Sequence, residues 1–390
     1  MLTVGDPAPW FVAPSSVNPR FDFSQAAGRH IALCFFGSGG NPEIARMIKT
    51  LHEPANLLDD GRISFFGVSN DPADENREAT KARVPGIRFF WDFNHEVAKL
   101  YDVAERLTGP NGATPVTFLL DPFLRVLGVL RDLSPANHAK ALMAAVIALP
   151  TPAKPEPAPQ VAPVLVIPRV LEPSFCRELI KLYDTNGGED SGFMRNDNDG
   201  RTYGMIDYRF KRRRDYNIED ETVRRALAAR IKQRLIPEIH KAFQFQVTRI
   251  ERYIVACYNS NEGGYFKAHR DNTTKGTAHR RFAVTMNLNA EEYEGGDLMF
   301  PEFGTRTYRA PTGGAAVFSC SLLHEATPIR SGKRYCTLPF LYDDAAAKVR
   351  EANLKFMAPT DEWKNANKGD TDGISKPALD IFMPPPVISG

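Results

Sequence analysis

Two apolar segments separated by a helical pattern dominate the beginning of the chain. The runs HIALCFFG (30–37) and ISFFGVSN (63–70) are rich in aromatic and β-branched residues, which favours buried strands. Between them, apolar residues recur at helical spacing from 42 to 58. The order strand, helix, strand is typical of a βαβ unit with two parallel strands.

The following segments extend this unit into a complete domain. Apolar runs at 114–122 and 126–132 are followed by an alanine-rich amphipathic stretch at 135–149. Strands that alternate with helices usually form a sheet with helices on its faces. We therefore expect residues 1–149 to form an α/β sandwich domain.

The second half of the chain changes from helical to alternating patterns. The run VLVIPRVL (164–171) precedes a helix that begins at Pro173, and helical spacing recurs from 219 to 243. From 246 onward, six or more short segments with period-two alternation are separated by Gly-rich turns. This pattern predicts a jelly roll, or double-stranded β-helix, with supporting helices over 164–345.

A proline-rich segment separates the two halves. Of the 390 residues 30 are proline, and six of these lie among the 14 residues of PTPAKPEPAPQVAP (150–163). Such a segment forms an extended spacer and cannot build a core, so we predict a linker at 150–163. The tail, 346–390, shows little periodicity, and we expect it to wrap the surface or to be partly disordered.

Charge and cysteine content narrow the function classes. Forty-nine Lys and Arg against 47 Asp and Glu leave a net charge of +2, too small for the broad positive field of a nucleic-acid-binding protein. No signal-peptide pattern and no apolar run of membrane-spanning length is visible. Five scattered cysteines without a CxxC pair suit a reducing compartment. We expect a cytoplasmic protein that binds neither nucleic acid nor membranes.

One group of residues has the pattern of a metal site. His269 and Asp271 are two residues apart, so on an extended strand their side chains share a face. His324 follows another apolar run, and Arg334 comes ten residues later. Two imidazoles and one carboxylate form the facial triad of non-haem Fe(II) oxygenases, and a guanidinium binds a carboxylate through two donors. A local hydrogen bond in an exposed turn is the alternative explanation for His269 and Asp271.

This order resembles the Fe(II)/2-oxoglutarate dioxygenases, specifically their prolyl 4-hydroxylase-like branch. Tyr258 with Gly263 and Gly264, and Glu294-Gly295-Gly296-Asp297 before Phe300-Pro301, resemble further motifs of that family. The resemblance implies that His269, Asp271 and His324 hold Fe(II). It also implies that Arg334 and Tyr258 bind the far carboxylate of 2-oxoglutarate. Fe(II), 2-oxoglutarate, O2 and the reductant ascorbate are the expected cofactors, and a peptidyl, amino-acid or small-metabolite C–H bond is the expected target.

Some residues near these motifs have more than one interpretation. Relatives with the arginine often carry Ser or Thr two residues later, where this chain has Cys336, so that residue either replaces a co-substrate contact or is a small buried residue. His279 is a candidate competing metal ligand, but it follows a polar loop of the kind that covers an active-site mouth. The basic run 209–214 is either a solvated face or a substrate-binding segment, with Arg212, Arg214 and Tyr203 as candidate substrate contacts.

The first domain resembles the peroxiredoxin (AhpC/TSA) branch of the thioredoxin fold over about residues 2–148. That family places its nucleophilic cysteine at the start of a helix, where this chain reads GSGGNPE. Cys34 lies inside an apolar strand pattern instead, where burial raises a thiol pKa. Pro115 matches the position of a cis proline in thioredoxin folds, so we predict a cis bond at Thr114–Pro115. We expect this domain to serve as a scaffold for dimerisation or substrate docking.

Three function classes follow from these patterns. The leading hypothesis is a two-domain hydroxylase that depends on Fe(II) and 2-oxoglutarate. The alternatives are a thiol peroxidase built on the N-terminal half, which requires a reactive Cys34, and a binding module whose jelly roll has lost catalysis.

Overall fold

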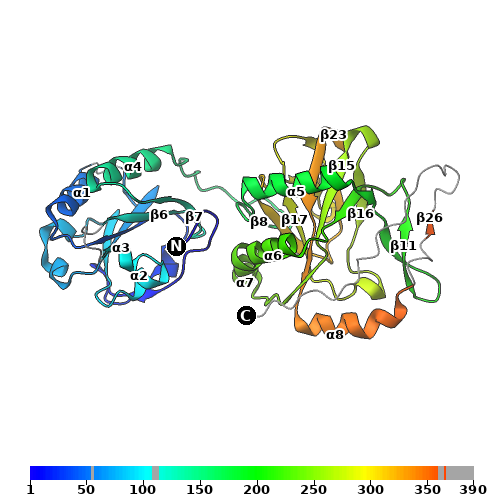
Figure 1. Cartoon of the computed structure of the whole chain (residues 1–390), viewed down its shortest axis with the longest axis horizontal. Helices are drawn as coiled ribbons and strands as arrows, with labels where there is room; N and C mark the ends of the chain where they lie inside the picture. Colours follow the sequence, from blue (N-terminus) through cyan, green and yellow to red (C-terminus); the bar gives the residue numbers. More distant parts are fainter. Residues whose placement is uncertain (54–56, 108–113, 359–363, 366–390) are drawn as a thin grey trace. The chain divides into compact units, whose positions relative to one another are not determined.

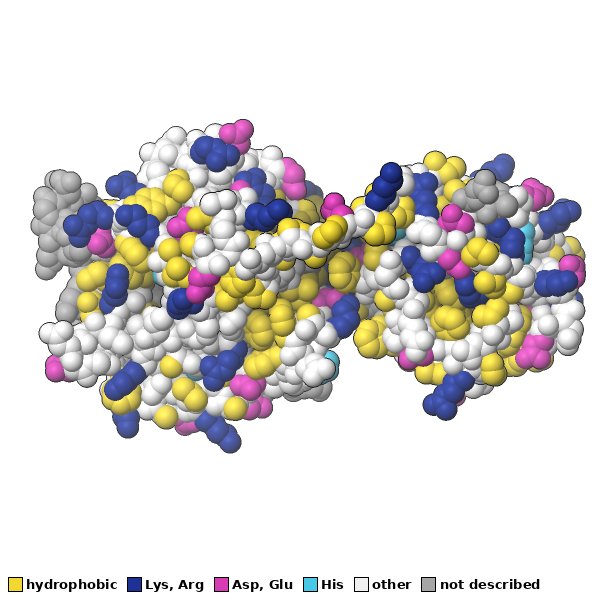
Figure 2. Space-filling model, turned by 180° about the vertical axis from the view of Figure 1, so that it is seen from behind, with side chains coloured by type: hydrophobic (Ala, Val, Ile, Leu, Met, Phe, Trp, Pro, Cys, Tyr) yellow, Lys and Arg dark blue, Asp and Glu magenta, His cyan; other side chains and the backbone are white. Residues whose placement is uncertain are grey.

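The computed structural model describes residues 1–53, 57–107, 114–358 and 364–365 and shows two compact units, Met1–Pro157 and Ala158–Gly390 (Figure 1). The division falls inside the proline-rich segment 150–163. Within the part that is described, no helix is long and apolar enough to span a membrane. Basic and acidic side chains are interspersed over the face drawn in Figure 2, in keeping with the small net charge.

The first unit is built around a five-stranded sheet of order β5-β4-β3-β6-β7. Strands β3, β4 and β5 are parallel, whereas β6 and β7 are antiparallel to their neighbours. A short hairpin, β1-β2, lies outside this sheet. The strands are β1 (Val12–Ala13), β2 (Phe21–Asp22), β3 (His30–Gly37), β4 (Ile63–Ser69), β5 (Ile87–Trp91), β6 (Val116–Leu120) and β7 (Val126–Leu130), and the helices are α1 (Pro42–His52), α2 (Glu96–Leu100), α3 (Ala104–Leu107) and α4 (Pro135–Ala148).

Alternate residues of β3 enter two different cores, because this central strand is covered on both faces. Ala32, Cys34 and Phe36 pack with α1 and α4 on one face. Ile31, Leu33 and Phe35 pack on the other face with α2, α3 and the N-terminal segment. This arrangement confirms the predicted thioredoxin-like α/β sandwich.

Three details of this unit differ from the sequence predictions. Helix α1 ends at His52 rather than at Leu58. Strand β5 was not predicted, although its sequence IRFFW is apolar and aromatic. The cis bond predicted at Thr114–Pro115 is wrong: among the residues that the structure describes, the cis peptide bond is Val84–Pro85.

The second unit contains two principal antiparallel sheets. The larger has the strand order β14-β25-β17-β24-β15-β13-β9, with β21 pairing to β17 and β8, and the smaller has the order β12-β16-β22-β19-β20. The strands of the larger sheet are β8 (Leu165–Ile167), β9 (Glu189–Asp190), β13 (Arg214–Asn217), β14 (Arg249–Glu251), β15 (Ile254–Asn259), β17 (Phe282–Asn287), β21 (Ala315–Ser319), β24 (Lys333–Thr337) and β25 (Phe340–Tyr342). Those of the smaller are β12 (Lys211–Arg212), β16 (Tyr265–His269), β19 (Leu298–Met299), β20 (Thr307–Tyr308) and β22 (His324–Ala326).

Helices cover the outer face of the larger sheet (Figure 1). Helix α5 (Pro173–Asn186) and the continuous segment α6 (Glu221–Arg230), η4 (Ile231–Leu235) and α7 (Ile236–Phe243) contribute to one core with alternate strand residues such as Val255 and Cys257. The opposite face of β15, with Ile254, Ala256 and Tyr258, packs with Phe266 of the smaller sheet. The predicted jelly roll with supporting helices is therefore confirmed, and its interior lies between the two sheets.

Smaller elements complete this unit. The pair β18 (Glu294–Gly295) and β23 (Ile329–Ser331) and the strands β10 (Phe193–Asn196), β11 (Thr202–Ile206) and β26 (Lys364–Asn365) form two further sheets. Strands β9 to β13 lie between α5 and α6, in a region for which the sequence predicted no strands. A helix, α8 (Asp344–Asn353), occupies the start of the predicted tail because Asp343 caps it. The prediction for 359–363 and 366–390 lies outside the described residues.

Candidate active site

The predicted metal ligands come together at the ends of two paired strands of the smaller sheet. His269 ends β16, Asp271 follows two residues later, and His324 begins β22. Strands β16 and β22 are antiparallel, and their register places His269 directly opposite His324. Sheet pairing therefore joins residues that are far apart in the sequence. One ligand atom from each of the three residues lies within 4.8 Å of the other two.

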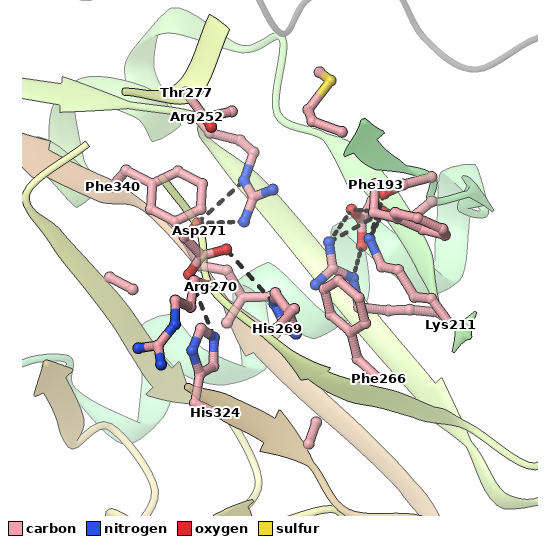
Figure 3. Close-up of a pocket in the computed structure, with 18 of the residues that line it drawn as sticks. Phe193, Lys211, Arg252, Phe266, His269, Arg270, Asp271, Thr277, His324 and Phe340 are labelled. Atoms are coloured by element: carbon pink, nitrogen blue, oxygen red, sulfur yellow. Dashed lines mark hydrogen bonds and ion pairs between the residues drawn. The ribbon is translucent and has the colours of Figure 1, made fainter. Parts of the chain in front are cut away.

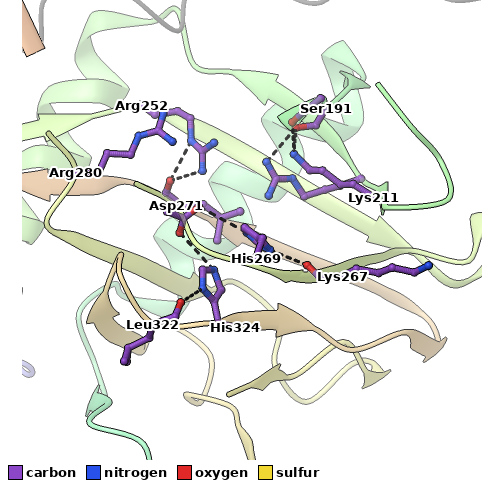
Figure 4. Close-up of polar contacts among 12 residues, drawn as sticks. Ser191, Lys211, Arg252, Lys267, His269, Asp271, Arg280, Leu322 and His324 are labelled. Carbon is purple, nitrogen blue, oxygen red and sulfur yellow. Dashed lines mark hydrogen bonds and ion pairs between the residues drawn. The ribbon is translucent and has the colours of Figure 1, made fainter. Parts of the chain in front are cut away.

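The imidazoles are oriented so that Nε2 of both rings faces the carboxylate of Asp271 (Figure 4). His269 Nε2 lies 3.6 Å from Oδ1, and His324 Nε2 lies 3.3 Å from Oδ2. Each Nδ1 contacts a backbone carbonyl, that of Lys267 at 2.7 Å and that of Leu322 at 3.0 Å. A carbonyl oxygen only accepts, so Nδ1 carries the proton and the Nε2 lone pair is available to a metal.

The electrostatics of the cluster suit a bound cation. Burial lowers the pKa of His269, which keeps that imidazole neutral. Burial acts to raise the pKa of Asp271, but the imidazoles of His324 and His269 more than offset it, and the pKa lies well below its usual range. The carboxylate of Asp271 is therefore anionic and the imidazole of His269 neutral at neutral pH.

The three ligands line a cavity of about 620 Å³ between the sheets (Figure 3). Aromatic rings hold the imidazoles in place: Phe266 stacks on His269 at 3.5 Å between ring centroids, and Phe318 meets His324 edge-on at 4.6 Å. Tyr258 and Arg334 also line the cavity. The volume is in the range typical of small-molecule sites.

Arg334 and Tyr258 lie side by side on neighbouring strands. The register of β15 and β24 pairs the two residues, and the guanidinium carbon of Arg334 lies 5.0 Å from the centroid of the Tyr258 ring. Arg334 is buried and donates from Nη1 to the carbonyl of Gly296 at 2.6 Å. Its Nε is buried without a hydrogen-bond partner in the described part of the chain. A buried guanidinium with an unused donor fits a carboxylate ligand, because such donors are costly when unpaired.

The basic run 209–214 contributes residues that the sequence prediction did not select. Lys211 and Arg213 face the cavity. Arg212 and Arg214 are exposed and lie outside the cavity lining. Tyr203 is half-buried and also lies outside the lining. Arg212 donates instead to the carbonyls of Tyr208 and Glu262. Consecutive residues in strands point to opposite faces, so the period-two alternation of this run was the signal that could have found Lys211 and Arg213.

Arg213 links Tyr258 to a buried ion pair. It bonds Asp215 through Nε at 2.7 Å and Nη2 at 2.6 Å, and its Nη1 lies 3.4 Å from the Tyr258 hydroxyl. Lys211 donates to the hydroxyl of Ser191 at 2.7 Å and the carbonyl of Gly192 at 2.6 Å. This network fixes the wall of the cavity beside Tyr258.

His279 belongs to a separate buried cluster. Its Nε2 lies 2.6 Å from Oε2 of Glu251. Arg280 donates to the other carboxylate oxygen of Glu251, Oε1, at 2.6 Å. These bonds hold the segment after the His269–Asp271 motif against β14. His279 therefore interacts with Glu251 rather than with the metal-ligand cluster.

The cysteines are buried free thiols. Cys336 packs in the apolar cluster that contains Ala256 and Tyr258 and does not belong to the cavity lining. In the first unit, burial raises the pKa of Cys34 to about 12. Helix α1 is capped by Asn41, and the preceding loop is bonded through Gly39 to the buried carboxylate of Asp74 at 2.7 Å.

Two family models match separate parts of the chain. Residues 253–342 match the 2OG-Fe(II) oxygenase superfamily, and residues 4–128 match the AhpC/TSA family. These matches confirm both resemblances found in the sequence motifs. The chain thus joins a segment that matches the 2OG-Fe(II) oxygenase superfamily to one that matches the AhpC/TSA family.

Several known proteins are similar to parts of this chain. The chain is 26% identical over 147 residues to a PKHD-type hydroxylase of Hyphomonas neptunium (35% of this chain, 63% of the relative) and 24% identical over 180 residues to one of Thioalkalivibrio sulfidiphilus (44% and 74%). It spans 42% and 54% of the length of the PKHD-type hydroxylases of Cupriavidus metallidurans and Burkholderia ambifaria. Similar solved structures include a Trichoplax adhaerens prolyl hydroxylase (18% identity, TM-score 0.36, 48% of this chain and 86% of that one) and a peroxidoxin, BcpB, of Mycobacterium tuberculosis (21%, 0.33, 38% and 99%).

Proposed function

We propose that the C-terminal domain is an Fe(II)- and 2-oxoglutarate-dependent dioxygenase. It hydroxylates an unactivated C–H bond of a peptidyl-prolyl, amino-acid or small-metabolite substrate and releases succinate and CO2. The observation that carries this proposal is the cluster of His269, Asp271 and His324, whose ligand atoms lie within 4.8 Å of one another in the cavity. Two imidazoles and a carboxylate on one side leave the remaining coordination positions open.

His269, Asp271 and His324 would hold Fe(II), which supplies the oxidising chemistry together with O2 and 2-oxoglutarate. The carbonyls of Lys267 and Leu322 hold the Nδ1 protons, so both Nε2 atoms stay directed at the metal position. Phe266 and Phe318 pack against the imidazoles and keep water from their ring faces.

Arg334 and Tyr258 would bind the far carboxylate of 2-oxoglutarate. Arg334 has a buried Nε with no partner among the described residues, and it lies against the Tyr258 ring. Arg213 reaches the Tyr258 hydroxyl and is itself fixed by Asp215, so the tyrosine is held in position. Cys336 is buried next to this site and supplies no contact to the cavity.

The proposal also assigns a role to the rest of the chain. We assign residues 1–149 to a non-catalytic domain, 150–163 to a linker, 164–345 to the dioxygenase domain and 346–390 to the tail. We propose that the N-terminal domain serves as a scaffold for homodimerisation or substrate docking, since Cys34, its only thiol, is buried and poorly placed for peroxidase chemistry. A cytoplasmic location is supported by the free cysteines, and ascorbate is proposed as the reductant that keeps iron ferrous.

Anaerobic binding measurements test the site directly. Mn(II) should bind once per chain in equilibrium dialysis, and 2-oxoglutarate should bind tightly only when the metal is present. Asp271→Ala should abolish metal binding, whereas Arg334→Met should retain the metal and weaken 2-oxoglutarate binding. Metal binding that is unchanged in Asp271→Ala would place the metal elsewhere and refute the proposal.

A further inference from the structure

Arg252 is a cavity cation that lacks an anionic partner in the part of the chain that the structure describes. It lies between β14 and β15 and lines the cavity next to Asp271 (Figure 3). Its Nε and Nη2 donate to one neutral acceptor, the carbonyl of Leu338, at 3.1 and 2.9 Å. Its guanidinium packs on the ring of Phe340 at 4.7 Å. No carboxylate in the described ranges forms an ion pair with it.

Three buried arginines of the same cavity wall, unlike Arg252, have an anionic partner or gain one under the proposed function. Arg213 binds Asp215 at 2.6 Å, and Arg280 binds Glu251 at 2.6 Å. Under the proposed function, Arg334 pairs with the far carboxylate of 2-oxoglutarate. Fe(II) is neutralised by Asp271 and the other carboxylate of the co-substrate. Once metal and co-substrate are bound, Arg252 is the guanidinium in this group that remains uncompensated.

The surroundings of Arg252 make this isolation costly. Burial, followed by the charge of Arg213, lowers the pKa of Arg252 to about 10, which reflects an environment that disfavours its charge. The backbone of Arg252 is also left-handed, with φ of 74°, a conformation that non-glycine residues rarely adopt. Strained residues of this kind concentrate at ligand-binding sites.

Arg252 and Arg334 lie toward different ends of the cavity. Tyr258, the neighbour of Arg334, is four residues from Ile254 along β15, which separates their Cα atoms by about 13 Å, and Arg252 precedes Ile254. Under the proposed function, the far carboxylate of the co-substrate would bind at the Arg334 end of the cavity and not at Arg252. Figure 3 shows Arg252 beside Asp271, on the metal side of the cavity.

We infer that the substrate is a carboxylic acid whose carboxylate binds Arg252 while its target C–H bond faces the metal position. The inference rests on the proposed function and adds the substrate class. A guanidinium binds a carboxylate through two parallel hydrogen bonds, so the fixed fork of Arg252 is suited to one carboxylate.

Matched substrate pools test the substrate class. One pool holds N-acetyl derivatives of the uncharged amino acids with free carboxylates, and the other holds the same compounds as primary amides. With full-length protein, Fe(II) and 2-oxoglutarate, the acids should stimulate succinate release and gain one oxygen, and the amides should not. The inference alone is contradicted if the amides stimulate succinate release as much as the acids or more. It is also contradicted if neither pool stimulates release while basal 2-oxoglutarate turnover persists. Absence of any iron-dependent 2-oxoglutarate turnover contradicts the proposed function instead.

Variants of Arg252 test the residue. Arg252→Met should raise the KM for the acid by about 10- to 100-fold and leave the KM for the co-substrate within about twofold, and Arg252→Lys should restore part of the loss. Arg209→Met, at an exposed arginine paired with Asp207 outside the cavity lining, is the matched control. Calorimetric titration of the acid into protein loaded with Mn(II) and N-oxalylglycine should show the highest affinity for the wild type and Arg209→Met, a lower one for Arg252→Lys and the lowest for Arg252→Met. An unchanged KM and affinity in Arg252→Met would overturn the assignment.

Discussion

Each imidazole of the proposed metal site is oriented by a nearby backbone carbonyl. In both cases Nδ1 contacts the carbonyl of the residue two positions earlier, Lys267 for His269 and Leu322 for His324. A backbone carbonyl is present whatever side chain occupies that position. The orientation therefore depends on the backbone rather than on a second side chain.

Arg334 should determine the affinity for the co-substrate. Arg334→Met removes the charge and the donors but keeps an unbranched side chain in the buried position. Hydrogen bonds to charged groups contribute about 1.5–3 kcal/mol, so the KM for the co-substrate should rise by about 10- to 100-fold. Steady-state kinetics at varied 2-oxoglutarate concentration measure this effect. A KM that stays close to the wild-type value would assign the carboxylate to another residue.

Glu251 should stabilise the fold in a pH-dependent manner. Burial acts to raise its pKa, but Arg280 and His279 lower it well below the ordinary value of 4.5. A folded-state pKa below the unfolded value gives stability that is complete above about pH 4.5 and is lost as the pH falls further. Glu251→Gln should therefore lower the unfolding free energy by about 3 kcal/mol at pH 7, because it breaks a buried ion pair.

Urea unfolding of wild type and Glu251→Gln at pH 7 and at lower pH measures this difference. The gap between the two proteins should narrow below about pH 4.5. Glu219→Gln, at an exposed position of the same domain, should change little at either pH. A gap that widens on acidification would contradict the assigned direction of the pKa shift.

At the scale of elements, the glycine motifs shape the strands that surround the cavity. Gly295 in β18 has φ of 73°, and an added Cβ would lie 2.3 Å from the carbonyl oxygen of Pro328. Gly263, in the turn before β16, has φ of 64° with open space around it. Both positions favour glycine for its backbone freedom, but only Gly295 also requires the absence of a side chain.

This contrast gives a direct stability test. Gly263→Ala should cost about 1 kcal/mol of unfolding free energy through its positive φ. Gly295→Ala should cost at least about 2 kcal/mol, since β18 and β23 must also separate. Denaturant unfolding curves compare the two variants. Equal destabilisation of the two variants would show that the contact between the added Cβ and Pro328 does not contribute to the loss of unfolding free energy.

The elements also show where sequence reasoning reached its limit. The helices that begin at Pro42, Pro135 and Pro173 were predicted at their starts, because proline and capping residues mark a helix start locally. The inward alternation of Lys211 and Arg213 was overlooked, because a run of charges resembles a solvated face. Lys211 and Arg213 can be buried because Ser191 and Asp215 bind them. Ser191 lies 20 residues before Lys211 in the sequence.

At the scale of the whole molecule, motif-based predictions were more complete for the metal ligands than for the rest of the cavity. His269, Asp271 and His324 follow from spacing and residue order. Arg252 carries no motif, and its isolation becomes visible only when the partners of all neighbouring charges are known. The same holds for Glu251 with His279, which are joined by chain folding across 28 positions.

The N-terminal domain should lack thiol peroxidase activity. At neutral pH a thiol with a pKa of about 12 is almost entirely protonated, and Cys34 is fully buried in β3. Peroxide consumption by the full-length protein with dithiothreitol should equal the background rate, and Cys34→Ser should leave it unchanged. Peroxide turnover that disappears in Cys34→Ser would restore the peroxidase hypothesis.

The central claim is that His269, Asp271 and His324 form the iron centre of a 2-oxoglutarate-dependent dioxygenase. The most direct test is succinate release from 2-oxoglutarate by the full-length protein, measured with and without Fe(II). We predict release that requires Fe(II) and falls at least about 100-fold in His269→Ala and in Asp271→Ala, since either change removes a ligand. Turnover that persists in both variants, or that proceeds equally well without iron, would contradict the account.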